Sequence, residues 1–495
     1  MVDPRTLTPR WPRTELLIDG QSVAPLEGGT LALRNPATGD ALPAAPAAGP
    51  RDVEAAVLAA RRAFDVGPWP RMNASARGRL LRKLADALWE RREEFALIES
   101  LNNGKTFAEA LKGDVAPGAA TLAYASEWAN KVLGEVVPVD GTFLTYVLRE
   151  PVGVVAAIVP WNYPTSLACW KVGPALATGC TVVLKPSELT PLTAMKLGEL
   201  AREVGFPDGV LNVLPGEGMS AGEALARHPG VDKVAFTGSI RTARRLLHAS
   251  ADTNLKRLSL ELGGKSPQVV LADANFAQAV EACLWGIFGC KGEVCSAGSR
   301  VIVEARLYEA FVEALAERAR ALRVGDPLDP ATEMGAQVTA SHLDTILGYV
   351  ASGKAEGARL VAGGARDTQG DKARGNFLQP TVFSEVRPGM RIAEEEIFGP
   401  VVACMRVQDA AEAIALANAT PYGLGASLWT SDVARAHALA RRLKSGVVWI
   451  NCFNEFDDAA PFGGVKQSGW GRDLSQHALH NYLEYKTVWT RLSDA

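Results

Sequence analysis

The chain has few cysteines and histidines for its length. Its seven cysteines are spaced unevenly over 495 residues and do not form the framework of a disulfide-stapled secreted domain. We therefore expect a reducing, cytoplasmic environment in which one thiol is free to react. The six histidines are equally scattered, and neither a Cys-x-x-Cys nor a His-Glu-x-x-His motif is present, so the sequence predicts no metal site.

Long apolar runs and excess positive charge are also missing. No uninterrupted apolar segment reaches the ~18 residues that a membrane-spanning helix needs. A formal net charge of −3 disfavours nucleic acid or an acidic membrane surface as the main partner. Residues 1–11 contain no apolar core of a secretory signal. The composition that remains, 47% hydrophobic and 22% charged, is typical of a globular protein.

The hydrophobic pattern predicts an α/β protein that begins with helices. Residues 53–65 and 74–100 carry apolar side chains at intervals of three and four, which is typical of amphipathic helices. From residue 151 short Val/Ile-rich strands alternate with helices. The expected strands are 153–159, 181–184, 211–214 and 234–236, and the helices are 167–177, 191–205 (with Thr190 as N-cap) and 240–249. Such alternation indicates βαβ units and a parallel sheet.

A second alternating series after residue 264 predicts a second α/β domain. Its strands are expected at 268–271, 300–304, 400–407, 424–429 and 446–451, and its helices at 275–288 and 307–323. Residues 135–150 are expected to form a hairpin, and the tail 482–492 is strand-like. Exposed strands of this kind are usually covered, which a partner subunit in a homodimer or homotetramer can do.

Cys295 lies in a loop of small residues between an apolar helix and a Val/Ile-rich strand. Upstream, Glu261 lies beside two glycines in the segment Leu260–Lys265. A thiol can carry an acyl group as a thioester, and a carboxylate can activate the water that hydrolyses it. The pair points to oxidation of an aldehyde.

Polar side chains also follow two predicted strands of the first domain. Asn162 can offer an N–H group to a developing oxyanion, or it can satisfy its own turn. Lys185 and Glu188 can hold ribose hydroxyls at the carboxyl end of a parallel strand, or they can form a surface ion pair.

Two further segments carry weaker signals. Gly238 and Ser239 precede a predicted helix, whose N-terminus is a ready anion site, although the segment is not a Gly-x-Gly-x-x-Gly fingerprint. The acidic pair Glu395 and Glu396 leads into an apolar strand and is either functional or a solvated turn.

Together these segments resemble the NAD(P)-dependent aldehyde dehydrogenase superfamily over roughly residues 20–490. Seven stretches carry the resemblance: Pro160–Pro164, Lys185–Glu188, Phe236–Ser239, Leu260–Lys265, the Cys295 loop, Glu396–Pro400 and Pro461–Gly464. The resemblance implies an NAD-binding domain of Rossmann-like type (1–126 and 151–262) and a catalytic domain (263–465). It also implies a small β segment for oligomerisation and bridging (127–150 and 466–495).

The resemblance also implies a role for each site residue. Cys295 attacks the aldehyde, Asn162 stabilises the oxyanion, and Glu261 activates water. Lys185 and Glu188 hold the adenosine ribose, and Gly238 and Ser239 meet the pyrophosphate. Trp161 borders the cofactor, Glu396 binds the nicotinamide ribose, and Phe398 packs near its ring. Glu188 favours NAD over NADP, because a 2′-phosphate would meet its carboxylate.

The chain departs from the family pattern just before Cys295, where Cys290-Lys291-Gly292-Glu293 replaces Asn-Gln-Gly-Gln or similar. Lys291 either lowers the pKa of Cys295 or points to solvent. Cys290 either forms a disulfide under oxidation or is a small buried residue.

The substrate pocket is expected to contain Tyr163, Trp170 and Phe462, with acidic charge from Asp457 and from Asp114 at an entrance. Aromatic rings around a cation are a usual way to hold an ammonium group. The chain resembles betaine aldehyde, other aminoaldehyde, and γ-glutamyl- or guanidino-butyraldehyde dehydrogenases here, which predicts a cationic aldehyde. Gly289 leaves the aromatic cage incomplete, so a general apolar funnel for aliphatic or aromatic aldehydes is the alternative.

Two other functions remain as alternatives. A catalytically silent structural or binding protein would have lost Cys295, Glu261 or Asn162, and all three are present. A CoA-acylating enzyme of this family characteristically lacks the water-activating glutamate, so Glu261 favours hydrolysis.

Overall fold

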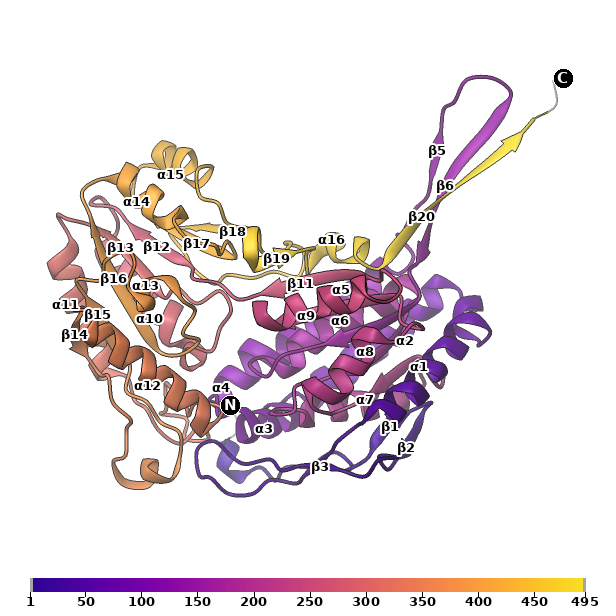
Figure 1. Cartoon of the computed structure of the whole chain (residues 1–495), viewed down its shortest axis with the longest axis horizontal. Helices are drawn as coiled ribbons and strands as arrows, with labels where there is room; N and C mark the ends of the chain where they lie inside the picture. The colour runs from indigo at the N-terminus through magenta and orange to yellow at the C-terminus, as the bar shows by residue number, and fades with distance from the viewer. Residues whose placement is uncertain (1–2, 493–495) are drawn as a thin grey trace.

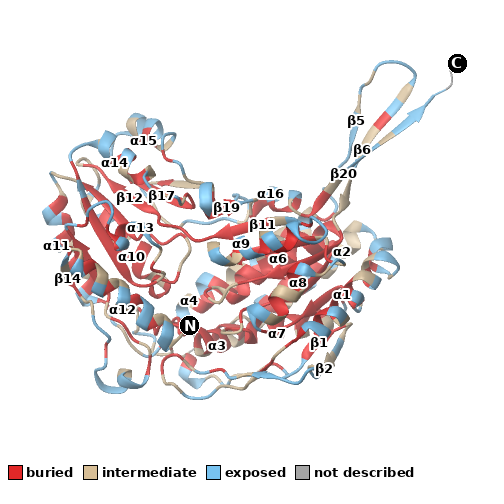
Figure 2. Ribbon diagram, viewed as in Figure 1, coloured by how far each residue is buried: buried red, intermediate tan, exposed pale blue. Residues whose placement is uncertain are grey.

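The computed structural model describes residues 3–492, which form two α/β domains and a β arm that projects from them (Figure 1). The α/β architecture predicted from the sequence is confirmed. Both sheets lie in the buried interior, and the arm extends into solvent (Figure 2).

The first domain is built on an eight-stranded sheet of order β19-β11-β10-β7-β8-β9-β1-β2. Its five central strands run parallel: β7 (Val154–Ile158), β8 (Thr181–Lys185), β9 (Leu211–Val213), β10 (Lys233–Gly238) and β11 (Arg257–Leu262). Both edges are antiparallel, with β19 (Gly469–Trp470) beside β11, and β1 (Leu16–Ile18) and β2 (Gln21–Val23) beside β9. These edge strands are absent from the sequence prediction because two or three residues give no periodicity.

Helices flank this sheet. They are α1 (Pro50–Asp65), α2 (Ala74–Glu90), α3 (Arg92–Asn103), α5 (Ala116–Trp128), α6 (Pro164–Thr178), α7 (Leu192–Glu203), α8 (Glu223–Arg227) and α9 (Ile240–Ala251). Two predictions are corrected. The apolar periodicity over 74–100 belongs to two helices, because Arg91 leaves helical geometry between them. Thr190 does not cap α7, because its hydroxyl donates instead to the carbonyl of Trp161 (3.1 Å).

The second domain contains a seven-stranded sheet of order β14-β15-β16-β13-β12-β17-β18. Its strands are β12 (Pro267–Val270), β13 (Arg300–Glu304), β14 (Arg359–Ala362), β15 (Thr381–Ser384), β16 (Val401–Val407), β17 (Gly425–Trp429) and β18 (Val447–Ile450). All neighbours are parallel except β14 and β15. Its helices are α10 (Phe276–Phe288), α11 (Tyr308–Ala321), α12 (Ala340–Ala355), α13 (Arg391–Glu394), α14 (Ala410–Asn418) and α15 (Val433–Ala440).

The arm is a three-stranded antiparallel sheet of β5 (Glu135–Val137), β6 (Phe143–Pro151) and β20 (Leu483–Arg491). β20 pairs with β6 along its whole length, so the two ends of the predicted bridging segment meet in one sheet. Residues 466–482 lie elsewhere, because β19 joins the first sheet and α16 (Ser475–His480) contacts α6. Within residues 3–492 no helix combines the length and apolarity needed to cross a membrane.

Candidate active site

A cleft of about 570 Å³ opens at the carboxyl ends of β7, β10 and β11, where the second domain faces the first sheet. Ligands bind at this edge of open parallel sheets. Eight of the predicted site residues line the cleft: Trp161, Asn162, Gly238, Ser239, Glu261, Cys295, Glu396 and Phe398.

Cys295 enters the cleft from the second domain, on the loop between α10 and β13. Gly264 lets this loop approach the first domain, because a Cβ there would lie 2.8 Å from the carbonyl oxygen of Cys295. Burial, with Glu396 and then Glu261 nearby, raises the pKa of the Cys295 thiol to about 12. The thiol is therefore protonated at neutral pH until a partner stabilises its anion.

Glu261 ends β11 with its carboxylate inside the protein, and the residue is only 4% exposed. Neither carboxylate oxygen has a hydrogen-bond partner among the described residues. Burial and the nearby Asp473 raise its pKa, and Lys171, which pairs with Asp473 at 2.5 Å, partly opposes this shift. A buried carboxylate without a partner is costly, and such groups occur preferentially at functional sites.

Asn162 is fixed by a contact that is distant in sequence. Its Nδ2 donates to the main-chain carbonyl of Glu293 at 2.9 Å, and the residue is 2% exposed. Its side chain therefore does not satisfy its own turn, which was the alternative interpretation. One N–H of the amide is held by Glu293, and the second remains for a ligand in the cleft.

Aromatic rings and Glu396 form the side of the cleft next to the second domain. The rings of Trp161 and Phe398 meet edge to face at 5.2 Å, and His342 packs against both. Glu396 Oε1 accepts a hydrogen bond from the Gly264 amide at 3.1 Å. Burial raises the pKa of Glu396 to about 7.

The opposite side of the cleft is the N-terminus of α9. Ser239 caps this helix through the amide of Thr242, and Arg241 in its first turn also lines the cleft. The hydroxyl of Thr237 is buried there without a partner among the described residues. A helix N-terminus beside an arginine and an unpaired hydroxyl suits the phosphates of a dinucleotide.

Lys185 and Glu188 lie beyond the residues that line the cleft. Lys185 ends β8, is buried, and pairs with the half-exposed Glu188 at 3.2 Å. Burial lowers the pKa of Lys185 despite this pair. Both predicted functions of the pair, an ion pair and a ribose site, are compatible with this position at the carboxyl edge of the sheet.

Aromatic residues of the C-terminal loops pack beside Cys295. Trp170 of α6 meets Phe462 at 5.5 Å, and Phe462 meets Phe456 at 5.4 Å. Phe462 and Trp170 belong to the same apolar cluster as Cys295. We call Trp170, Phe456 and Phe462 the aromatic mouth.

Three residues expected at the substrate pocket already have partners within the protein. One face of the Tyr163 ring is covered by Lys105, whose Nζ lies 4.3 Å from the ring centroid. Asp457 is exposed and accepts a hydrogen bond from the Ala459 amide in its own turn (2.8 Å). Asp114 is fully buried in an ion pair with Lys105 (2.7 Å), so it does not lie at an entrance.

The two residues that depart from the family pattern are also buried. Lys291 is 0% exposed and pairs with Glu293, so it does not point to solvent. Cys290 is a buried free thiol whose pKa burial raises to about 12.

Helix α12 contributes His342, Thr345 and Tyr349 to the cleft, and the sequence prediction missed all three. Apolar spacing could have predicted the helix, but not which domain its polar side faces. Among residues 3–492 no group of three or more metal-ligating side chains comes together.

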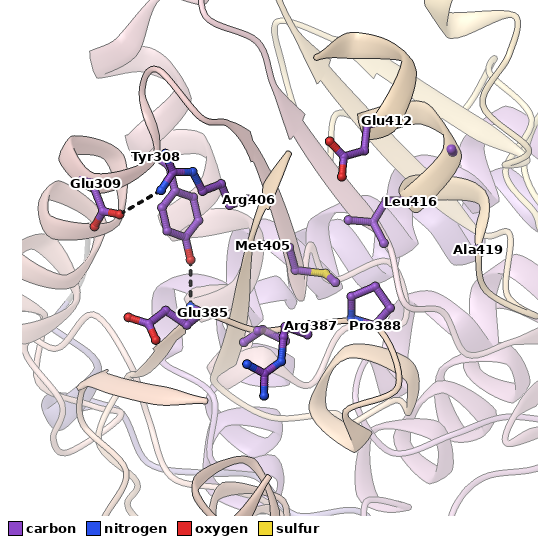
Figure 3. Close-up of a pocket in the computed structure, with 12 residues that line it drawn as sticks. Tyr308, Glu309, Glu385, Arg387, Pro388, Met405, Arg406, Glu412, Leu416 and Ala419 are labelled. Atoms are coloured by element: carbon purple, nitrogen blue, oxygen red, sulfur yellow. Dashed lines mark hydrogen bonds and ion pairs between the residues drawn. The ribbon is translucent and has the colours of Figure 1, made fainter. Parts of the chain in front are cut away.

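A second hollow, of about 660 Å³, lies on the second domain away from this cleft (Figure 3). Several polar groups at its rim have partners in the protein: Arg406 lies 3.6 Å from Glu309, and the Tyr308 hydroxyl accepts from the Glu385 amide at 2.8 Å. None of the predicted site residues lines this hollow, so its size does not make it the active site.

The fold and cleft define a class of enzyme in which a thiol, a buried carboxylate and an amide face a dinucleotide-sized cavity between two α/β domains. A model described as "Aldehyde dehydrogenase family" matches residues 24–488, and the chain belongs to this family. Human aldehyde dehydrogenase 1A1 is 45% identical over 481 residues, which cover 97% of this chain and 95% of the relative.

Solved structures agree with this assignment. An NAD⁺ complex of an aldehyde dehydrogenase from Bacillus cereus is 44% identical, with a TM-score of 0.95 and 97% of each chain covered. A mutant of the P. syringae indole-3-acetaldehyde dehydrogenase in complex with NAD⁺ and IAA is also 44% identical, with a TM-score of 0.96 and 99% and 98% of the two chains covered. The family predicted from the sequence is thereby confirmed.

Proposed function

We propose that the protein oxidises an aldehyde to the carboxylic acid with NAD as hydride acceptor, through a thioester on Cys295. The observation that carries this proposal is the convergence of the Cys295 thiol, the unpaired Glu261 carboxylate and the Asn162 amide on one cleft. NAD⁺, when bound, supplies the hydride acceptor. The helix N-terminus of α9, Glu396 and the Trp161–Phe398 pair fit its phosphates, ribose and ring.

Cys295 begins the reaction by forming a C–S bond to the aldehyde carbon, while its proton passes from the sulfur to solvent. The carbonyl oxygen becomes an alkoxide, which the free N–H of Asn162 and the Cys295 amide stabilise. Loss of hydride from the same carbon restores the C=O bond and leaves a thioester on Cys295.

Glu261 completes the cycle. Its raised pKa makes it a stronger base than an exposed glutamate once it is ionised, so it can take a proton from water as the water attacks the thioester. The C–S bond then breaks, and the acid leaves. The presence of this base favours hydrolysis over transfer of the acyl group to CoA.

The substrate that the cleft supports best is an uncharged aldehyde with an aromatic or apolar body. The aromatic mouth offers packed rings, and one face of the Tyr163 ring is already occupied by the ammonium of Lys105. A relative with this fold is named for indole-3-acetaldehyde, which is uncharged and aromatic. The cationic aldehyde predicted from the sequence is the second candidate, favoured by the exposed acids Glu455 and Asp457 on the same loop.

A panel of aldehydes, followed by NADH absorbance, tests the function and the substrate class together. We expect phenylacetaldehyde and hexanal to exceed betaine aldehyde and 4-aminobutyraldehyde in kcat/KM, without a requirement for CoA. Higher kcat/KM for the cationic aldehydes would support the second candidate. Activity that depends on CoA would contradict hydrolysis by Glu261.

Three further features are part of the proposal. Glu188 favours NAD over NADP. The ratio of kcat/KM with NAD to kcat/KM with NADP tests this preference, and Glu188→Gln is expected to lower the ratio.

The exposed apolar residues of the arm, such as Val136, Tyr485 and Trp489, suit burial in a homodimer or homotetramer. Analytical ultracentrifugation measures the number of subunits. Seven free thiols suit a reducing, cytoplasmic compartment.

A further inference from the structure

Behind the reacting groups lies a buried ion pair that the proposed reaction does not use. Glu293, two residues before Cys295, is 0% exposed, and its Oε2 lies 2.6 Å from Nζ of Lys291, which is also 0% exposed. Glu293 Oε1 accepts a hydrogen bond from the Val338 amide at 3.0 Å. A buried ion pair adds little net stability over an apolar pair of similar size, so its presence suggests a different role.

The ion pair holds Asn162 from two directions. The main-chain carbonyl of Glu293 accepts the Asn162 amide at 2.9 Å. Lys291 donates to the Asn103 side chain at 2.9 Å, and Asn103 in turn donates to the carbonyl of Trp161 at 2.8 Å. The residues form a closed ring of contacts that fixes both the Asn162 side chain and the peptide that precedes it.

His342 extends this arrangement to the cofactor side. Its Nε2 lies 2.8 Å from the carbonyl of Phe398, so that nitrogen carries the hydrogen, because a carbonyl can only accept. The same nitrogen lies 3.8 Å from Glu293 Oε1. Phe398 has a φ of 59°, which is unfavourable for a residue with a side chain and requires contacts that hold it.

We propose that Lys291, Glu293 and His342 form a positioning cluster. It holds the Asn162 amide, which stabilises the oxyanion, and the Phe398 ring at fixed positions relative to each other. The inference rests on the proposed function, since it assigns roles relative to the oxyanion and the nicotinamide ring. Lys291 and Glu293 do not line the cleft, and His342 lines it beside the rings of Trp161 and Phe398. The cluster acts by fixing Asn162 and Phe398.

Glu293→Gln tests the cluster by removing the carboxylate charge while keeping the main-chain carbonyl. We expect the pre-steady-state rate of NADH formation to fall about 10–100-fold, because small displacements of catalytic groups have effects of that size. The NAD Kd, measured by protein fluorescence, should change less than threefold. Lys291→Gln combined with Glu293→Gln leaves a neutral amide pair like that of the family pattern, and should return the rate to within about fivefold of the parent.

Arg61→Gln is the matched control, because Arg61 pairs with Asp232 at the opposite end of β10 from the cleft. It should leave the burst rate unchanged. If Glu293→Gln lowers the melting temperature but leaves the burst rate per folded enzyme unchanged, the cluster is only structural and the proposal fails.

Two substitutions at His342 leave no buried charge without its partner, whereas Glu293→Gln leaves the charge of Lys291 unpaired. They therefore test the proposal even if Glu293→Gln does not fold. His342→Phe keeps the ring against Trp161 but loses the donor to Phe398, and should raise the NAD KM and lower the burst rate, each about fivefold or more. His342→Gln keeps a donor and should stay within about twofold. If both variants keep the parent's NAD KM and burst rate, the proposal fails. If the parent enzyme oxidises none of the aldehydes tested, the proposed function is contradicted instead.

Discussion

The reaction centre and the aromatic mouth are built in opposite ways. In the reaction centre polar groups are buried, with Glu261 4% and Asn162 2% exposed, and Glu261 has no hydrogen-bond partner among the described residues. In the mouth, Trp170, Phe456 and Phe462 meet ring to ring. A buried, unpaired carboxylate costs roughly 1–3 kcal/mol or more, whereas stacked rings stabilise the fold. We therefore expect the reaction to depend on a few groups that cannot be replaced, and the choice of substrate to depend on several that can.

The largest expected effect comes from the nucleophile. Cys295→Ala should lower NADH production by at least about 10³-fold and remove esterase activity on 4-nitrophenyl acetate, because Cys295 is the only thiol among the residues that line the cleft. Cys452→Ala, at another half-buried thiol, is the control and should retain activity. Substantial NADH production by Cys295→Ala would contradict the role of Cys295 as the nucleophile.

Asn162→Ala should have the next largest effect. Loss of one oxyanion donor lowers kcat by about 10²–10³-fold, while KM for NAD changes little. Steady-state kinetics with saturating aldehyde measure both. A selective rise in the NAD KM would assign Asn162 to the cofactor instead.

The mouth should respond more weakly. Phe462→Ala removes a ring that touches both Trp170 and Phe456, so kcat/KM for phenylacetaldehyde should fall about tenfold. For acetaldehyde, whose single methyl group has little surface to pack against the rings, the change should stay below about twofold. An equal fall for both aldehydes would mean that the ring supports the reaction centre rather than selecting the substrate.

The smallest effect concerns the pH dependence of cofactor binding. Burial raises the pKa of Glu396 to about 7, so its carboxylate forms as the pH rises from 6 to 8. Because the carboxylate accepts hydroxyl hydrogen bonds better than the acid does, the NAD Kd should fall several-fold over this range. Glu396→Gln should show a flat profile, and a profile as steep as the parent's would contradict this assignment.

The sequence predicted the reacting groups better than their surroundings. Glu261 and Asn162 lie at the carboxyl ends of parallel strands, which meet at one edge of the sheet, whereas Cys295 precedes a strand and was singled out by its loop of small residues and by the family resemblance. The structure brings all three to one cleft. The contact between Asn162 and Glu293 was not predictable, since 131 residues separate the two partners. The same reason explains why α12 and its His342 were missed.

The substrate pocket was the least predictable region. Tyr163 was expected to face a substrate cation, but Lys105 covers one face of its ring, and the sequence gives no periodic signal for that pairing. Asp114 was placed at an entrance from its charge alone, although Lys105 neutralises it in the interior. Ring and charge types indicate what a pocket can hold, but long-range packing decides which of them remain available.

The most direct test of the two-step account is a rapid-mixing experiment on Glu261→Gln. With a saturating aldehyde and NAD, this variant should release a burst of NADH close to one equivalent per active site and then slow by about 10²–10³-fold, because the thioester forms but water is not activated. A thioester should be detectable on Cys295 by mass spectrometry after the burst. Steady turnover at the parent's rate, or a fast burst with no acyl group on Cys295, would contradict the account.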